Sequence, residues 1–240
     1  MRTTLFILLL MTLTTGCTKW TPPPAKHRTL VIDKSNRHLL QTVGEDIPEI
    51  LESLRPEDLW NAVDFRVVSL GAVAYNRATE IELPAEDPDE GNPLARKRRM
   101  EAFLDRVAEI IRLSIGEPRD DSASVVYLPL ALEFERLAGC GGEIIIYSDL
   151  IEHLGKGKWS LYDDGLLDSL QRAPDAFVRH FEQQRVLPDL SDLTISVVNI
   201  PRNTPNSMRV STVYAWYERL WTAKDARVSI AGNYHCKLKK

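Results

Sequence analysis

Apolar and polar residues alternate along the chain in blocks that favour strands separated by helices. Short runs that are apolar throughout predict buried strands at 29–33, 64–74, 143–153, 193–201 and 226–232, and an alternating run predicts another at 79–84. Apolar residues at helical spacing predict helices at 45–54, 94–115, 125–139 and 210–223, with two shorter helical pieces between 155 and 190. Strands buried on both faces are typical of parallel sheets. The pattern therefore predicts an α/β domain, with a doubly wound, mostly parallel central sheet and helices on both faces, a three-layer sandwich.

The amino-terminal segment follows a different pattern. A positive charge precedes a short apolar run, Leu5 to Leu13, which is too short to span a bilayer as a helix and is typical of a signal peptide. The "TTGC" that follows resembles the lipobox of bacterial lipoproteins, with Thr14 where those proteins usually have an aliphatic residue. The resemblance implies that residues 1–16 are a lipoprotein signal peptide, cleaved after Gly16, and that Cys17 carries lipid. The protein is then expected to be anchored to a membrane of the bacterial cell envelope, with its domain exported to the periplasm or the surface. An ordinary cleaved signal peptide is the open alternative.

A proline-rich spacer at 17–27 connects this anchor to a single expected domain at 28–240. Apolar residues make up 44% of the chain and charged residues 27%, as in folded globular proteins. The formal net charge of −4 and the lack of a basic face argue against nucleic acid as a partner. The one dense basic run, Arg96 to Arg99, is expected to lie on the solvated face of a helix.

Several common site types lack their sequence signals. The five histidines are scattered, and no zinc spacing, nucleophile elbow, Walker loop or GxGxxG is present. Cys140 precedes one predicted strand and Cys236 follows another at the opposite end of the sheet, so we expect both to be unpaired. Four aromatic residues at helical spacing are expected to pack in the core: Tyr214, Trp216, Tyr217 and Trp221.

Two predicted strands each end with an aspartate and a serine. The first closes with Asp33, followed by Ser35, and the fourth with Ser148 and Asp149. In an open α/β sheet, ligands bind at the carboxyl ends of the strands, near the point where the strand order reverses. Carboxylate and hydroxyl oxygens are hard ligands that suit Mg²⁺. A magnesium site is therefore expected at this edge of the sheet.

A third oxygen could come from Ser122 or Ser124, before a helix whose amino terminus would also favour a partner's anion. The order of these pieces resembles the von Willebrand factor A domain and its metal-ion-dependent adhesion site. That site uses Asp-x-Ser-x-Ser after the first strand, a Thr before a middle helix and an Asp after the fourth strand. The resemblance implies that Mg²⁺ is held, directly or through water, by Asp33, Ser35, Ser124 and Asp149. It also implies that the ion binds an acidic side chain of a partner protein.

Arg37 stands where the second serine of that motif is expected, which leaves two interpretations open. In one, Asn36 or a water molecule completes a weak Mg²⁺ site. In the other, Arg37 points to solvent, or pairs with Asp149 and replaces the metal. Without an ion, Asp33 and Asp149 would be hydrogen-bonded carboxylates that cap the turns after their strands.

The leading functional hypothesis is a membrane-anchored envelope protein, not an enzyme, whose von Willebrand factor A-like domain binds another envelope protein. One alternative is a Mg²⁺-dependent phosphohydrolase of the haloacid dehalogenase type, with Asp33 as nucleophile. That family usually has a second Asp where this chain has Ser35. Another alternative is a metal-free scaffold whose loops, including 85–93 and 155–190, recognise the partner.

Overall fold

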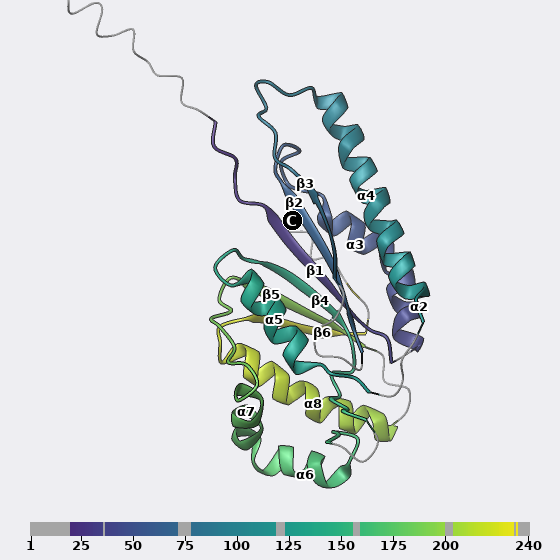
Figure 1. Cartoon of the computed structure of the whole chain (residues 1–240), viewed down its shortest axis with the longest axis vertical. Coiled ribbons are helices and arrows are strands. Elements are labelled where there is room, and N and C mark those ends of the chain that lie inside the picture. The colour runs from purple at the N-terminus through teal and green to yellow at the C-terminus, as the bar shows by residue number, and fades with distance from the viewer. Residues whose placement is uncertain are drawn as a thin grey trace, which may run out of the picture.

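The predicted strands assemble into one six-stranded sheet in the order β3-β2-β1-β4-β5-β6 (Figure 1). Every neighbouring pair is parallel except β2 and β3, which are antiparallel. The strands are β1 (Lys26–Asp33), β2 (Val63–Leu70), β3 (Ala78–Leu83), β4 (Gly142–Tyr147), β5 (Leu193–Val198) and β6 (Arg227–Ala231). The predicted α/β class is confirmed. The order reverses between β1 and β4, which makes their carboxyl ends the switch point of the sheet.

Helices cover both faces of this sheet (Figure 1). One face carries α2 (Arg37–Glu45), α3 (Ile47–Leu54) and α4 (Pro93–Gly116). The other face carries α5 (Tyr127–Leu137) and α8 (Thr204–Thr222), with α6 (Asp164–Arg172) and α7 (Pro174–Glu182) packed beside α8. In this computed structural model, the residues described are 20–35, 37–71, 78–118, 123–155, 159–199, 204–232 and 234.

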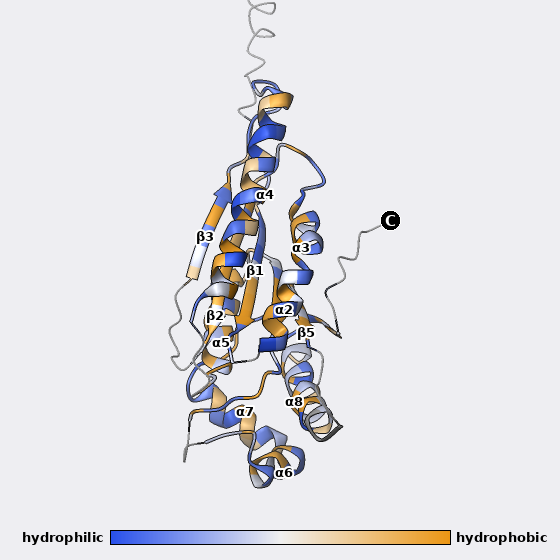
Figure 2. Cartoon of the chain, turned by 90° about the vertical axis from the view of Figure 1, so that its right-hand side faces the viewer, coloured by the Kyte–Doolittle hydropathy of each residue, from blue (hydrophilic) through white to orange (hydrophobic). Residues whose placement is uncertain are grey.

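The core has two halves, one on each side of the sheet. In β1, Leu30 and Ile32 belong to the half under α2, α3 and α4, whereas Val31 belongs to the half under α5 and α8. All three are fully buried, and burial of such a side chain stabilises a protein by about 1.5–3 kcal/mol. Figure 2 shows the apolar colouring on the strands and on the helix faces that turn toward them. Because helices cover both faces of the sheet, successive residues of a strand are all buried. This is why runs that are apolar throughout predict the strands.

The aromatic residues of α8 pack in the core, as predicted. Tyr214, Trp216, Tyr217 and Trp221 are all buried. The Tyr217 ring lies 4.7 Å from Trp216 and 5.0 Å from Trp221, measured between ring centroids. Contacts to other helices hold α8 in place, since Trp221 packs against Phe134 of α5 and Trp216 against Phe181 of α7. The Tyr214 hydroxyl reaches the Ser148 carbonyl at the switch point.

One helix was not predicted, and one local prediction was wrong. The chain after β1 forms the short helix α2, in which Leu39, Leu40 and Val43 are buried, although no helix was predicted before residue 45. In the basic run at the start of α4, Arg96 is fully buried, and only the other three residues are exposed. The Arg96 guanidinium is buried because backbone carbonyls of two neighbouring loops accept its hydrogen bonds.

Several sequence predictions lie outside the described residues: Cys17, Asn36, Ser122 and Cys236, with residues 1–19 as a whole. Cys140 is a free, exposed thiol in the turn before β4. Among the described segments, no helix combines the length and the apolar character needed to cross a membrane.

Candidate strand-end oxygen site

Asp33, the last residue of β1, is fully buried, and its carboxylate accepts four hydrogen bonds. Oδ1 accepts from the Ser35 backbone N–H at 2.9 Å and from the Ser35 hydroxyl at 2.7 Å. Oδ2 accepts from the Ser148 hydroxyl at 2.8 Å and, more weakly, from the Ser124 hydroxyl at 3.4 Å. A buried carboxylate is costly unless such partners compensate for its lost hydration. Three hydroxyl groups, from three separate segments of the chain, therefore donate hydrogen bonds to one carboxylate.

The backbone holds each of these segments in place. Ser124 exchanges two backbone hydrogen bonds with His153, at 2.7 and 2.9 Å, and the next residue donates to the Gly71 carbonyl. The Ser148 carbonyl accepts from the Tyr214 hydroxyl at 2.7 Å. Leu150 adopts a left-handed backbone conformation with φ of 58°, which non-glycine residues rarely do. This tight turn lets the Leu150 N–H donate to the Ser148 Oγ at 2.9 Å.

Asp149 lies in the same turn after β4 and is also buried. Its Oδ1 accepts from the Ile151 N–H at 3.0 Å and its Oδ2 from the Tyr162 hydroxyl at 3.2 Å. Burial, followed by the negative charge of Asp149, raises the pKa values of Tyr162 and Tyr214, and Asp33 contributes to both shifts. The two carboxylates therefore lie within electrostatic range of the same two tyrosines.

The cations that flank Asp33 in the sequence do not approach Asp149. Arg37 is exposed at the start of α2 and, among the described residues, forms no ion pair with Asp149. Lys34 is buried on the other side of the sheet, where its ammonium group contacts the Ser114 carbonyl and Glu117 near the end of α4. Of the positions considered for Arg37, the structure shows the solvent-exposed one.

Glu152 occupies the amino terminus of α5, where an anion from a partner was expected. Its Oε2 accepts from the backbone N–H groups of Val126 and Tyr127, both at 2.9 Å, and the residue is 2% exposed. Burial raises the Glu152 pKa to about 7, although the two N–H donors act in the opposite direction. The expectation of an open anion site at this helix was therefore wrong, since the protein's own carboxylate fills it.

Replacement of Glu152 by Gln is expected to change how stability depends on pH. Between about pH 4.5 and 7, the folded protein keeps a proton on Glu152 that the unfolded chain has lost. The free energy of unfolding of the parent, relative to E152Q, should therefore fall by about 2–3 kcal/mol from pH 5 to pH 8. Urea unfolding at both pH values measures this difference, and parallel pH dependence of the two proteins would contradict the assignment.

The donor set at the switch point suits a hard divalent cation. It contains carboxylate oxygens of Asp33 and Asp149 and hydroxyl oxygens of Ser35, Ser124 and Ser148, without a nitrogen or sulfur ligand among these residues. Such a set favours Mg²⁺ or Mn²⁺ over Zn²⁺. A hydroxyl that donates to Asp33 keeps lone pairs that can face a cation at the same time. The hydrogen-bonded arrangement is therefore compatible with a bound ion.

A scan against models of known protein families finds no match to this chain, and a search of curated proteins finds none either. Fold and site thus define only a class, a doubly wound α/β domain with a buried carboxylate–hydroxyl cluster at its switch point. The resemblance to the von Willebrand factor A domain stays a prediction.

Proposed function

We propose that this protein is a cation-dependent binding module of the von Willebrand factor A type. The observation that carries the proposal is the convergence of three hydroxyl groups on the Asp33 carboxylate at the switch point of the sheet. Switch points are where open α/β sheets bind ligands. This cluster is built from oxygen atoms alone, as a Mg²⁺ site requires.

Each residue of the cluster has a different role in the proposed site. Asp33 supplies a fixed negative charge and orients the hydroxyls of Ser35, Ser124 and Ser148. Asp149 adds a second carboxylate, which Tyr162 holds in position. Bound Mg²⁺ would supply the positive charge that attracts an acidic side chain of a partner. Arg37 adds an exposed positive charge just after β1, which favours the approach of an acidic surface.

The proposal also includes where the protein lies in the cell and which kind of partner it binds. Lipid on Cys17 would anchor the protein to a membrane of the bacterial envelope, and the spacer at 17–27 would connect the anchor to the domain. The partner is then another envelope protein that presents an Asp or Glu side chain. The anchor and the partner are the sequence-based parts of this proposal.

The geometry gives less support to the phosphohydrolase hypothesis. As a nucleophile, Asp33 would need an accessible oxygen, but the residue is fully buried and both oxygens accept hydrogen bonds. Ser35 occupies the position where the haloacid dehalogenase family usually has its second Asp. The neighbouring cation, Lys34, points away from Asp33, because its ammonium group contacts the Ser114 carbonyl on the opposite side of the sheet. An assay with an aryl phosphate separates the two ideas, because turnover that disappears in D33N would overturn the binding-module proposal.

Calorimetric titration of Mg²⁺ and Mn²⁺ tests the proposal. We expect the parent to bind Mn²⁺ in a step that is lost in D33N and S148A, since each variant removes an oxygen ligand or its orientation. D46N is a matched control, because Asp46 is another buried carboxylate with two donors, the Tyr147 hydroxyl and the Tyr234 N–H.

The outcome is decided by comparison of the variants. Binding that is unchanged in D33N and S148A would contradict the proposed site. Absence of binding in every protein would mean that the hydrogen bonds to Asp33 stabilise a metal-free scaffold. Circular dichroism of each variant shows whether the fold is retained.

A further inference from the structure

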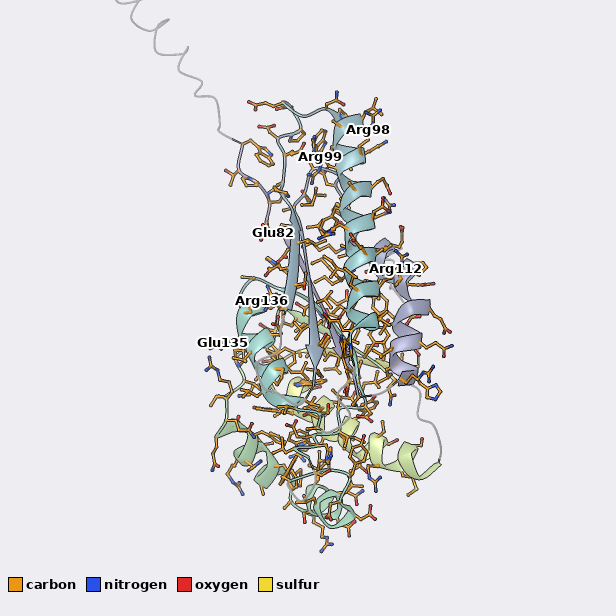
Figure 3. The ribbon with its side chains drawn as sticks, turned by 45° about the vertical axis from the view of Figure 1, so that its right-hand side comes forward. Glu82, Arg98, Arg99, Arg112, Glu135 and Arg136 are labelled. Atoms are coloured by element: carbon orange, nitrogen blue, oxygen red, sulfur yellow. The ribbon has the colours of Figure 1, made fainter. Side chains whose placement is uncertain are left out.

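A second group of carboxylates lies on the antiparallel ribbon of β2 and β3, on the side of the sheet that faces α5. Asp64 of β2 is directly opposite Glu82 of β3, and Glu80 is the next residue along the same face. These three residues can each offer an oxygen within 4.8 Å of the others. Figure 3 shows Glu82 and Arg136 on one side of the sheet, with α4 and its labelled arginines on the other.

Asp64 has an unsatisfied oxygen in this cluster. The residue is only 7% exposed, and its Oδ2 contacts the Nδ1 of His27 at 2.8 Å. Its Oδ1 is buried and has no hydrogen-bond partner in the described part of the chain. Buried carboxylate oxygens are almost always satisfied, so an orphaned one calls for a group that the protein itself does not supply. A donor or a cation at this position would remove the penalty.

The two nearby arginines do not fill this need. Arg66 bonds to Glu133 and to Oε2 of Glu80 at 2.9 Å. Arg136 bonds to Glu133, and its Nη1 lies 3.8 Å from Oδ2 of Asp64 and 3.9 Å from Oε1 of Glu80, beyond hydrogen-bond distance. Four carboxylates thus face two guanidinium groups and the His27 imidazole, so the carboxylates outnumber the cationic side chains around them.

Glu82 adds to the imbalance. It forms no hydrogen bond or ion pair with the residues that the structure describes, although the like charge of Asp64 lies directly across the ribbon. Like charges in directly opposed positions destabilise an antiparallel pair. Protection of the sheet edge by charged residues would explain an exposed Glu82. It would not explain the buried, unpaired oxygen of Asp64.

We propose that Asp64, Glu80 and Glu82 form a binding site for a hard divalent cation, with Ca²⁺ the best fit. Ca²⁺ binds several carboxylate oxygens in flexible geometry, and two of these three residues, Glu80 and Glu82, are exposed. The ion would join the edge strand β3 to β2. This site lies near the amino end of β2, whereas the Mg²⁺ site proposed above lies at the carboxyl ends of β1 and β4.

Thermal unfolding with and without Ca²⁺ tests this site. We expect Ca²⁺ to raise the melting temperature of the parent, since a ligand that binds only the folded state stabilises it. In E82Q the apparent affinity for Ca²⁺ should fall by about tenfold or more, since loss of a supporting group alone costs metal sites that much. Without Ca²⁺, E82Q should melt at a higher temperature than the parent, because the repulsion across the ribbon is removed.

Two further variants make the result specific. D33N should keep the Ca²⁺-dependent shift in melting temperature, which would show that this site is separate from the strand-end site. E90Q should keep the shift as well, because Glu90 is an exposed acidic residue in a turn outside the cluster. No shift in the parent, an unchanged shift in E82Q, or loss of the shift in D33N would each overturn the proposal.

Discussion

Replacement of Asp33 by Ala should lower the free energy of unfolding by about 3–5 kcal/mol, the largest effect expected of any change at the strand-end site. The substitution removes a buried acceptor on which the hydroxyls of Ser35, Ser124 and Ser148 converge. Those groups are then left in a space that water fills poorly. Urea unfolding at pH 7 without divalent cations measures the loss.

The single hydroxyl variants serve as controls for this effect. S35A removes one donor and leaves the other three contacts of Asp33, so it should cost about 1 kcal/mol. A loss below about 1 kcal/mol in D33A would contradict the view that the carboxylate organises the switch point.

Replacement of Arg96 by Met should lower the free energy of unfolding by about 2–4 kcal/mol. Met keeps much of the apolar stem but cannot donate hydrogen bonds. In the parent, the guanidinium donates to the carbonyls of Leu59, Asn61 and Pro84 at 2.7–2.8 Å and to Glu86 at 3.0 Å. These contacts tie the first turn of α4 to the segments before β2 and after β3.

Arg98 provides the matched control for Arg96. It lies two residues further along the same basic run and is exposed, so R98M should change stability by no more than about 0.5 kcal/mol. Urea unfolding of both variants gives the comparison. Equal effects would mean that the contacts of the buried guanidinium contribute little.

The central part of the site could be predicted because it depends on topology. Apolar runs identify β1 and β4, and the chain order of helices and strands places their carboxyl ends side by side. Asp33 and Ser148 therefore had to meet, although they are far apart in the sequence. The position before a helix on the same edge left Ser122 and Ser124 as candidates, and Ser124 alone was implied by the resemblance to the von Willebrand factor A domain.

The supporting contacts could not be predicted in this way. Glu152 reaches the start of α5 only because the chain turns back after Leu150, and no periodicity signals that turn. Its acidic position inside the apolar stretch "DLIEHL" was the available sign of a buried role. Tyr162 joins Asp149 from a segment without regular structure.

Charged residues near loops were the hardest to place. Arg96 belongs to a run that is otherwise exposed, and its burial depends on carbonyls that lie 12 to 37 residues away in the sequence. Asp64 and Glu82 are opposed only because β3 is antiparallel to β2. Neither the register of a ribbon nor the free acceptors of a loop can be derived from composition.

The proposed function depends on whether the oxygen cluster at the ends of β1 and β4 binds a divalent cation. Crystals grown with Mn²⁺ and measured for anomalous scattering test it most directly, because the manganese is located without reference to the protein atoms. We expect an anomalous peak within bonding distance of the oxygens around Asp33, Ser35 and Ser148. A map with no peak there, from crystals that hold Mn²⁺ elsewhere, would contradict it.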